Sequence, residues 1–284
     1  MRVLVTGASG LLGSRMLKGL PADWHVTGTY HSRPAPGLVE CRLGDRRSTA
    51  ALLSDGPYDC VIHCAAIRSP DVCQEDPREA VEVNAHGTER VARAAAAAGV
   101  RMAYASTDAV FRGDSPPYAE DAAPAPASVY GHSKLAGERH ALAVPGGLVV
   151  RMPALYSLDL DAPNNVLAGL RDSVRNGRAV LADDTMARYY TLAEDVAAAF
   201  AFLLASGRRG VVHVSAEETS TKCGFLRAAA EAMGLDRDLV MPAQRAKGAA
   251  PRPMDSRLDT KLYRTLGGPA FTGYAEALKR LPRP

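Results

Sequence analysis

A tyrosine and a lysine stand four residues apart in the stretch Tyr130-Gly131-His132-Ser133-Lys134. On a helix, side chains with this spacing share one face, one turn apart. A phenol with a pKa of about 10 is a poor acid–base group at neutral pH, and a nearby ammonium stabilises the phenolate and lowers that pKa. The pair therefore predicts that Tyr130 donates a proton to a carbonyl oxygen while a hydride reaches the carbonyl carbon. Lys134 could also bond the ribose next to the nicotinamide.

Three more polar residues could assist this chemistry. Thr107 and Asp108 follow the predicted strand Arg101–Ser106, and the carboxyl ends of parallel strands are where α/β proteins place their sites. Thr107 could bond the same substrate oxygen as Tyr130, and Asp108 either contacts substrate or caps the strand end. Asn84 could hold a water in a proton relay with Lys134, or could be an ordinary asparagine on a helix surface.

A glycine loop near the N-terminus predicts a dinucleotide site. Residues 6–13 read Thr-Gly-Ala-Ser-Gly-Leu-Leu-Gly, between a short apolar run and a helical pattern. Gly7 permits a tight turn, Gly10 lets the backbone approach a pyrophosphate, and Gly13 allows the helix to pack closely on the strand. The N–H groups at the start of the helix would then face the phosphates.

The residues after the second predicted strand bear on the choice between NAD and NADP. An NAD site usually has Asp or Glu there for the ribose 2′-hydroxyl, but this chain continues with His31, Ser32 and Arg33. Ser32 and Arg33 could hold a 2′-phosphate. The alternative is a surface loop with a free arginine. Asp45 could contact the adenine amino group, cap the helix that begins at Arg46, or do both.

The elements that position these residues alternate between strands and helices. Short apolar runs separated by helical patterns predict parallel βαβ units, and runs that are apolar on both faces indicate strands covered by helices on both sides. The predicted strands are Val3–Thr6, Trp24–Thr29, Leu38–Leu43, Asp59–Cys64, Arg101–Ser106 and Leu148–Met152, and the clearest helices are Leu11–Leu20, Ala80–Ala98 and Val129–Ala143.

The second half is less regular. Helical patterns cover Ala162–Gly177, Glu194–Ala205 and Lys222–Met233, a strand pattern covers Val211–Ser215, and Pro242–Asp255 is typical of a loop. We expect an α/β protein with a Rossmann-type doubly wound parallel sheet and a smaller C-terminal substrate lobe. Residues 1–155 would bind NADP(H), and residues 156–284 would mainly form the lobe, with some segments returning to the first domain.

Composition narrows the function classes. The 284 residues carry a formal net charge of +3 without a dense Lys/Arg run, which argues against a nucleic-acid partner. Apolar runs fall short of the roughly 20 residues of a membrane helix, and the N-terminus does not resemble a signal peptide, so we expect a cytoplasmic protein without a membrane partner. The five cysteines lack CxxC spacing, which predicts reduced thiols, and the pair His63-Cys64 lacks the further ligands of a metal site.

With these elements in order, the chain resembles the extended short-chain dehydrogenases/reductases. In particular it is similar to the dTDP-4-dehydrorhamnose reductases and to the regulatory beta subunits of methionine adenosyltransferase. The resemblance spans nearly the whole chain. It rests on the glycine loop, HCAA (63–66), VNAHGT (83–88), STDAVF (106–111), YGHSKLAGE (130–138) and RPMDSRLD (252–259).

The resemblance implies roles for individual residues. The catalytic triad would be Thr107, Tyr130 and Lys134. The cofactor would contact Gly7, Ser9, Gly10, Leu11, Leu12, Asp45, Arg46, Cys64, Ala65 and Ala66, with Arg68 near the nicotinamide end. To this cofactor set we add Gly13, His31, Ser32, Arg33, Asn84, Tyr130 and Lys134.

The resemblance also implies a function, with alternatives. The first is an NADPH-dependent reductase of a 4-keto-6-deoxy nucleotide sugar, with Asp108 and Arg188 on the substrate side; Arg188 could equally be a plain surface residue. The second is a non-catalytic NADP-binding regulatory subunit of another enzyme. For the assembly of this chain, both a homodimer and a complex with a partner enzyme stay open. The third is a reductase, dehydrogenase or epimerase of another carbonyl or alcohol, as in a secondary-metabolite pathway. Ala109, where the rhamnose enzymes have an aromatic residue, and the changed stretch Arg151–Tyr156 leave the sugar undecided.

Overall fold

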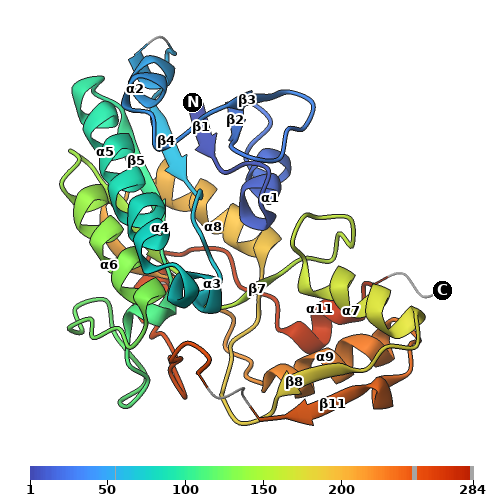
Figure 1. Ribbon diagram of the computed structural model, residues 1–284. Helices are drawn as coiled ribbons and strands as arrows, with labels where there is room; N and C mark the ends of the chain where they lie inside the picture. Colours follow the sequence, from blue (N-terminus) through green and yellow to red (C-terminus); the bar gives the residue numbers. More distant parts are fainter. Residues whose placement is uncertain (55, 245–247, 282–284) are drawn as a thin grey trace.

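A seven-stranded parallel sheet organises the protein (Figure 1). The structure is a computed structural model that describes residues 1–54, 56–244 and 248–281. The strand order is β10-β6-β5-β4-β1-β2-β3, so the chain moves outward from β1 to one edge and then from β4 to the other. The strands are β1 (Arg2–Thr6), β2 (His25–Tyr30), β3 (Leu38–Glu40), β4 (Cys60–His63), β5 (Arg101–Ala105), β6 (Leu148–Arg151) and β10 (Gly210–His213).

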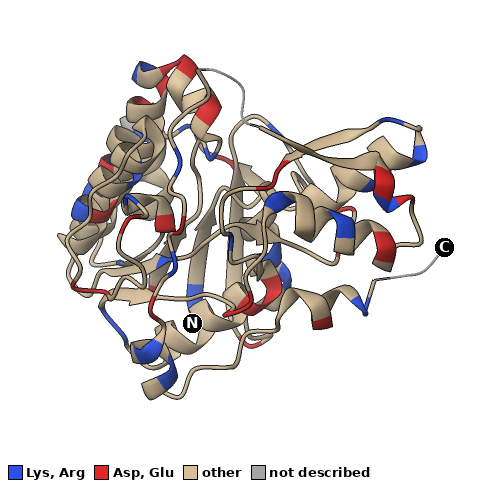
Figure 2. Ribbon diagram, turned by 90° about the horizontal axis from the view of Figure 1, so that it is seen from below, with Lys and Arg blue, Asp and Glu red and all other residues tan. Residues whose placement is uncertain are grey.

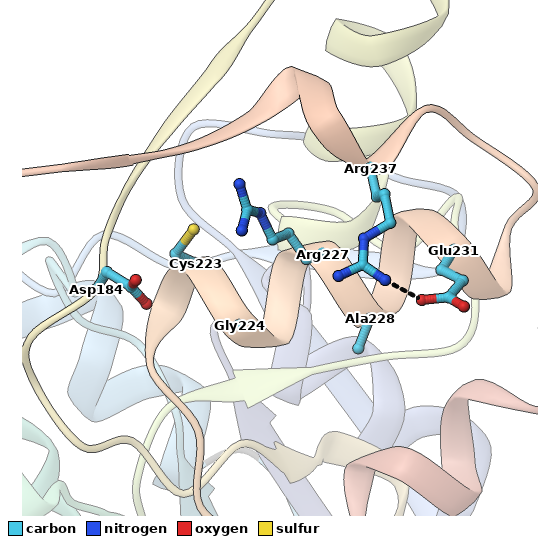
Figure 3. A pocket seen from close by; sticks show the side chains of 7 residues that line it. All are labelled: Asp184, Cys223, Gly224, Arg227, Ala228, Glu231 and Arg237. Atoms are coloured by element: carbon cyan, nitrogen blue, oxygen red, sulfur yellow. Dashed lines mark hydrogen bonds and ion pairs between the residues drawn. The ribbon is translucent and has the colours of Figure 1, made fainter.

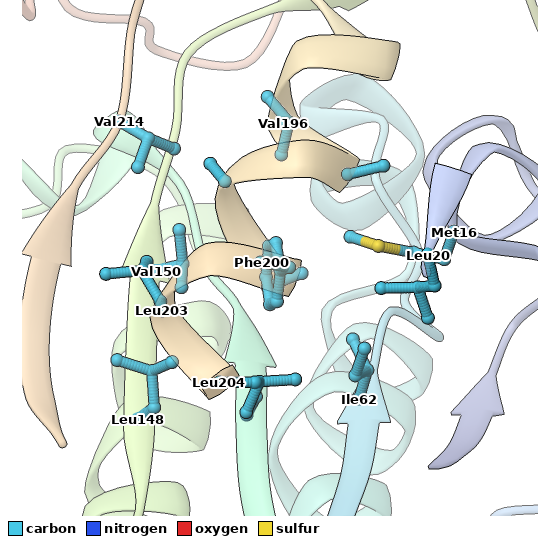
Figure 4. Close-up of a cluster of buried hydrophobic side chains, with 14 of the residues drawn as sticks. Met16, Leu20, Ile62, Leu148, Val150, Val196, Phe200, Leu203, Leu204 and Val214 are labelled. Atoms are coloured by element: carbon cyan, nitrogen blue, oxygen red, sulfur yellow. The ribbon is translucent and has the colours of Figure 1, made fainter. Parts of the chain in front are cut away.

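Alternate side chains of the central strands enter two different cores, as the period of two requires. On one face, Val3 and Val5 of β1 pack with helices α1 (Leu11–Gly19) and α8 (Ala193–Ala205), where Phe200 lies at the centre (Figure 4). On the other face, Leu4 packs toward α2 (Arg46–Ser54), α5 (Thr88–Ala97) and α6 (Val129–Leu142). Burial on both faces explains why the strands contain runs of Val, Ile and Leu.

A smaller lobe follows β6 and has its own apolar core. Its elements are β7 (Leu155–Tyr156), α7 (Val166–Arg175), β8 (Val180–Asp183), β9 (Thr191–Leu192), α9 (Lys222–Ala232), β11 (Val240–Ala243) and α11 (Tyr274–Leu278). Phe225 stacks on Tyr190, with 3.8 Å between the ring centroids, inside the core that α7 and α9 share. Between these elements the chain returns to the large sheet with α8 and β10, and α10 (Lys261–Thr265) packs near β10.

Most predicted elements are present, with four corrections. The helix predicted over Ala80–Ala98 is α4 (Pro77–Val81), a π-helical segment η1 (Glu82–Gly87) and α5. The third strand ends at Glu40 instead of Leu43. The helix predicted from Ala162 begins at Val166, because Asn165 is its N-cap. The first two residues of the predicted loop Pro242–Asp255 belong to β11, which pairs with β8.

Charged residues and cysteines are distributed over the whole described structure. Basic and acidic residues are interspersed in the view of Figure 2. Four of the five cysteines are buried, and all five are free thiols. Among the described residues, none of the helices combines the length and apolar character that a membrane crossing requires, and no cluster of His, Cys, Asp and Glu has the composition of a metal site.

Candidate active site

The glycine loop joins β1 to α1, and two of its glycines have no room for a side chain. Gly7 has φ +69°, and a Cβ there would lie 2.7 Å from the Cα of Ala65. A Cβ on Gly13 would lie 2.3 Å from the carbonyl oxygen of Gly7 and 2.7 Å from the Cα of Ala8. Gly7 therefore lets β1 turn against the end of β4, and Gly13 lets α1 pack directly on the loop.

The start of α1 presents free backbone N–H groups. Gly10 is the N-cap and has no side chain to accept from them, and in the described part of the chain no other side chain caps this end. Leu11 is buried against Ala162 of the smaller lobe, while Ser9 and Leu12 are half-buried. An uncapped helix start beside a glycine turn is suited to a phosphate group.

The loop after β2 is open to solvent. His31, Ser32 and Arg33 are all exposed, so the Arg33 guanidinium can reach an anion without giving up a buried partner. Asp45 accepts from the N–H of Arg47 at 2.9 Å and caps α2. The capping role is therefore present, and the adenine contact stays a prediction. The side chain of Arg46 lies outside the described residues.

The end of β4 runs beside the glycine loop. The N–H of Cys64 donates to the carbonyl oxygen of Thr6 at 3.2 Å, and burial raises the pKa of the Cys64 thiol to about 12. Ala65 and Ala66 are half-buried, and the exposed Arg68 reaches the carbonyl oxygen of Asn164 in the smaller lobe at 3.5 Å. These residues thus line the same side of the sheet edge as Gly7.

The ring of His63 is a buried structural group. Its Nδ1 lies 2.6 Å from the hydroxyl of Thr6 and its Nε2 3.1 Å from that of Thr88. Burial, with a smaller effect from Lys134, lowers the pKa of His63 to about 3. A neutral imidazole with both nitrogens occupied ties β1, β4 and α5 together and does not serve as a metal ligand here.

Helix α6 carries Tyr130 and Lys134, and Ser128 caps its start by accepting from the N–H of Gly131 at 3.1 Å. The phenol of Tyr130 lies near the hydroxyl of Thr107. Burial raises the pKa of Tyr130, and the neighbouring Thr107 hydroxyl opposes that rise only in part. The expected lowering of this pKa by Lys134 is therefore wrong for the structure as it stands: the phenol is held protonated.

Lys134 explains the difference because its ammonium has other partners. Its Nζ donates to the carbonyl oxygen of Ala105 at 2.8 Å and lies 4.0 Å from the centre of the Tyr104 ring. Burial lowers the pKa of Lys134 to about 8. The ammonium thus lies at the carboxyl end of β5, in contact with Ala105 and Tyr104.

Asn84 is fully buried in η1, so its placement on a helix surface is wrong. Its Oδ1 accepts from the N–H of Ile67 at 2.8 Å, and its Nδ2 donates to the Ile67 carbonyl oxygen at 2.9 Å and to the hydroxyl of Ser133 at 3.0 Å. Asn84 thereby fixes the segment after β4 against α6. A relay through water to Lys134 stays a prediction. π-Helical segments occur frequently at functional sites.

Thr107, Asp108 and Arg188 lie close together. The Thr107 hydroxyl donates to Asp108 Oδ1 at 3.1 Å, and Arg188 attracts the Asp108 carboxylate. The Arg188 guanidinium is half-buried and donates to the carbonyl oxygens of Ala187 and Pro253 at 2.7 and 3.1 Å. Arg188 is thus not a plain surface residue.

Sequence reasoning missed Ser256, which donates to Asp108 Oδ2 at 2.5 Å. It also missed the buried pair of Glu138 and Arg151 next to the site. All three residues belong to stretches singled out above. Glu138 lies in YGHSKLAGE, Arg151 begins the stretch Arg151–Tyr156, and Ser256 lies in RPMDSRLD. The sequence motifs therefore pointed to these residues, but the hydrogen-bond partner of each one depends on tertiary contacts.

A separate hollow lies in the smaller lobe, along α9 (Figure 3). Its lining includes Cys223, Arg227 and an ion pair between Glu231 and Arg237, whose nearest N and O atoms are 2.8 Å apart. None of the predicted site residues lines it. We therefore place the candidate site at the sheet edge and not in this hollow.

Comparison with known proteins agrees with this geometry. The family model described as "RmlD substrate binding domain" matches residues 1–283. The chain belongs to this family. Its members resemble the extended short-chain dehydrogenases/reductases, so the family, the α/β fold and the large parallel sheet are as the sequence predicted.

Individual relatives are named either as methionine adenosyltransferase subunits or as reductases. The chain is 35% identical over 277 residues to "Methionine adenosyltransferase 2 subunit beta" of Xenopus tropicalis, covering 94% of this chain and 82% of the relative. It is 32% identical to a "Probable low-salt glycan biosynthesis reductase" of Haloferax volcanii, covering 91% and 90%.

Solved structures share the fold over nearly the whole chain. A dTDP-4-dehydrorhamnose reductase from Bacillus anthracis in complex with NADP has a TM-score of 0.85 at 25% identity, covering 99% of this chain and 96% of that one. A UDP-glucose 4-epimerase from Thermus thermophilus in complex with NAD has a TM-score of 0.85 at 28% identity, covering 99% and 97%.

Proposed function

We propose that this RmlD-family protein is an NADP(H)-dependent reductase of a carbonyl on a nucleotide-linked sugar, most specifically a 4-keto-6-deoxy sugar. One observation carries the proposal: Tyr130 of α6 lies beside Thr107 at the carboxyl end of β5, on the side of the sheet where β1 opens into the glycine loop. A proton donor next to a dinucleotide-binding turn is what carbonyl reduction requires.

The residues present fit a nicotinamide dinucleotide. Gly7 and Gly13 leave backbone where a side chain would collide, and the uncapped start of α1 suits the pyrophosphate. Ser9, Gly10, Leu11 and Leu12 would surround it, and Cys64, Ala65, Ala66 and Arg68 would lie toward the nicotinamide end. When bound, the cofactor supplies the hydride.

The side chains of this protein would handle the proton. Thr107 and Tyr130 would both donate to the carbonyl oxygen and orient it. For this, the Thr107 hydroxyl would turn its proton from Asp108, to which it donates at 3.1 Å, to the substrate. As negative charge grows on that oxygen, the Tyr130 phenol would give it a proton. The Lys134 ammonium, 2.8 Å from the Ala105 carbonyl oxygen, would bond the cofactor ribose.

Two features support the finer points. Ser32 and Arg33 stand where an NAD site would have an acid, and Arg33 is exposed, which favours a 2′-phosphate and therefore NADP. The nucleotide sugar would be held by the smaller lobe, which residues 156–284 mainly form, and by Arg188, whose guanidinium lies near Asp108.

The test is consumption of NADPH by the purified protein with a panel of 4-keto nucleotide sugars and other carbonyl compounds. We expect turnover that disappears in Tyr130→Phe, while NADPH binding measured by fluorescence stays nearly unchanged. Full activity in Tyr130→Phe would contradict the assignment of the proton donor.

A second candidate is a regulatory subunit that binds NADP(H) and docks on another enzyme. The observation that favours it is the 35% identity to a methionine adenosyltransferase beta subunit over most of both chains. Tight NADPH binding without turnover of any panel member would favour this candidate. Co-elution with a methionine adenosyltransferase catalytic chain in size-exclusion chromatography would then establish it.

A further inference from the structure

A segment near the C-terminus crosses the candidate site, and we call residues 248–259 the crossing segment. At its start, the N–H of Ala250 donates to Asp71 Oδ1 at 3.0 Å, and Arg252 forms an ion pair with the same carboxylate. Asp71 lies in helix α3 (Pro70–Glu75), directly after the strand end that carries Cys64 and Arg68. The start of the crossing segment is therefore attached to the cofactor side of the site.

The middle and the end of the crossing segment are attached to two other parts of the chain. The N–H of Ala187 donates to the Met254 carbonyl oxygen at 2.9 Å. Further on, the N–H of Tyr118 donates to the Arg257 carbonyl oxygen at 2.9 Å, and the N–H of Asp259 returns a bond to Tyr118 at 2.7 Å. Contacts on three sides fix the backbone on either side of Ser256, whose side chain is 1% exposed.

Ser256 and Thr107 share one carboxylate. Ser256 Oγ donates to Asp108 Oδ2 at 2.5 Å, and Thr107 Oγ1 donates to Asp108 Oδ1 at 3.1 Å. A hydroxyl has one proton and two lone pairs. Because Thr107 gives its proton to Asp108, its oxygen accepts from the N–H of Ala109 at 3.1 Å. The direction of the Thr107 O–H bond is thus set by the position and charge of Asp108.

We propose that Ser256 is a positioning residue, which fixes the Asp108 carboxylate and, through it, the Thr107 hydroxyl beside Tyr130. Its effect on turnover rests on the reductase function proposed above, whereas its effect on Asp108 does not. The crossing segment would thus couple the end of the chain to the proton-donating group.

The groups that face Asp108 give this role a measurable consequence. Burial raises the pKa of Asp108, and the Ser256 hydroxyl, the Arg188 charge, the Thr107 hydroxyl and the Ala109 N–H oppose that rise, with Ser256 the strongest. Tyr130 is the titratable group on the facing helix. Removal of the Ser256 hydroxyl should therefore make the Asp108 carboxylate harder to ionise.

The first test follows the side-chain carboxyl carbon of Asp108 by NMR in protein labelled with ¹³C-aspartate, with Asp108→Asn to assign the signal. In Ser256→Ala the titration midpoint should rise by about one pH unit, as the loss of one bond to a carboxylate predicts. Ser256→Thr should restore it. Ser215→Ala is the matched control, because Ser215 is also buried but donates to the Ala216 carbonyl oxygen. An unchanged midpoint in Ser256→Ala would overturn the proposal.

The second test measures turnover in the same variants. We expect kcat to fall about tenfold in Ser256→Ala, as the loss of one such bond predicts, with recovery in Ser256→Thr and unchanged NADPH binding. A shifted Asp108 with unchanged kcat would overturn the catalytic part of the proposal. If the wild type reduces no carbonyl, the reductase function fails, and the Asp108 titration still decides the role of Ser256. Should Ser256→Ala not fold, Ser256→Cys, which keeps the size but bonds weakly, replaces it in both tests.

Discussion

The carboxylate of Glu138 and the guanidinium of Arg151 form a two-pronged ion pair, with Nε 2.9 Å from Oε1 and Nη2 2.8 Å from Oε2. Both side chains are at most 4% exposed. Glu138 lies one turn after Lys134 on α6 and also accepts from the hydroxyl of Ser106, the residue before Thr107, at 2.5 Å. The pair therefore joins helix α6, which carries Tyr130, to the end of β5, which leads into Thr107.

Glu138→Gln should lower the free energy of unfolding by about 3–5 kcal/mol, because it leaves the buried Arg151 charge without its partner. The measurement is urea denaturation followed by circular dichroism. Glu276→Gln is the control, since Glu276 also accepts from a basic side chain, Lys279, but in an exposed pair; we expect little change there. Equal losses in the two variants would contradict this account of the buried pair.

Gly13→Ala should abolish NADPH binding and destabilise the protein. The added Cβ would lie 2.3 Å from the Gly7 carbonyl oxygen, so α1 would have to move off the loop that we propose to bind the phosphates. Gly169→Ala in α7 is the matched control: its Cβ would meet nothing within 4 Å. There the change should stabilise the protein by about 0.5–1 kcal/mol through helix propensity. Binding is measured by NADPH fluorescence and stability by thermal unfolding; unimpaired binding in Gly13→Ala would show that the close approach is not required.

Arg33→Ala should weaken NADPH binding far more than NADH binding. The exposed guanidinium lies after β2, where it can pair with the 2′-phosphate that NADH lacks. A charge-assisted bond of this kind contributes about 1.5–3 kcal/mol, which corresponds to a loss of at least tenfold in affinity. Arg209→Ala, an exposed arginine before β10 at the opposite edge of the sheet, is the control for net charge. Equal losses for both cofactors would refute the preference for NADP.

The elements of the large sheet were predictable because their sequence pattern has one physical cause. Runs such as Val3–Val5 are apolar at every position because helices cover both faces of the sheet. Since all these strands are parallel, their carboxyl ends meet at one edge, so Thr107 and the glycine loop could be expected there before any coordinates. Two-residue strands such as β7 and β9 are too short to leave a periodic pattern.

The finer contacts of the site could not be predicted because they depend on tertiary neighbours. The spacing of Tyr130 and Lys134 places both on one face, but it does not reveal that the Ala105 carbonyl oxygen and the Tyr104 ring receive the ammonium. In the same way, Ser256 is an ordinary serine in a proline-rich stretch until the crossing segment brings it to Asp108. The order of motifs along the chain indicates the family. The partners and pKa values of Lys134 and Asp108 depend instead on how distant segments pack together.

The pKa of Lys134 predicts how stability depends on pH. Burial lowers this pKa to about 8, from 10.5 for an ordinary lysine. Below pH 8 the lysine is charged in both the folded and the unfolded chain, and above pH 10.5 it is neutral in both. Between these values the unfolded chain binds more protons, so the contribution of Lys134 to stability becomes more favourable as pH rises.

Lys134→Met removes this titration and should therefore be compared with the wild type at pH 7.5 and pH 10 by urea unfolding. The unfavourable contribution of the buried charge is about 3 kcal/mol at the lower pH, from the size of the pKa change. The stability advantage of Lys134→Met at pH 7.5 should shrink by most of that amount at pH 10, because the thiols and phenols that titrate in this range are present in both proteins. Lys261→Met, at an exposed position of α10, controls for the loss of a charge. A difference between wild type and Lys134→Met that does not change with pH would mean that the lysine ionises in the folded protein as it does in water.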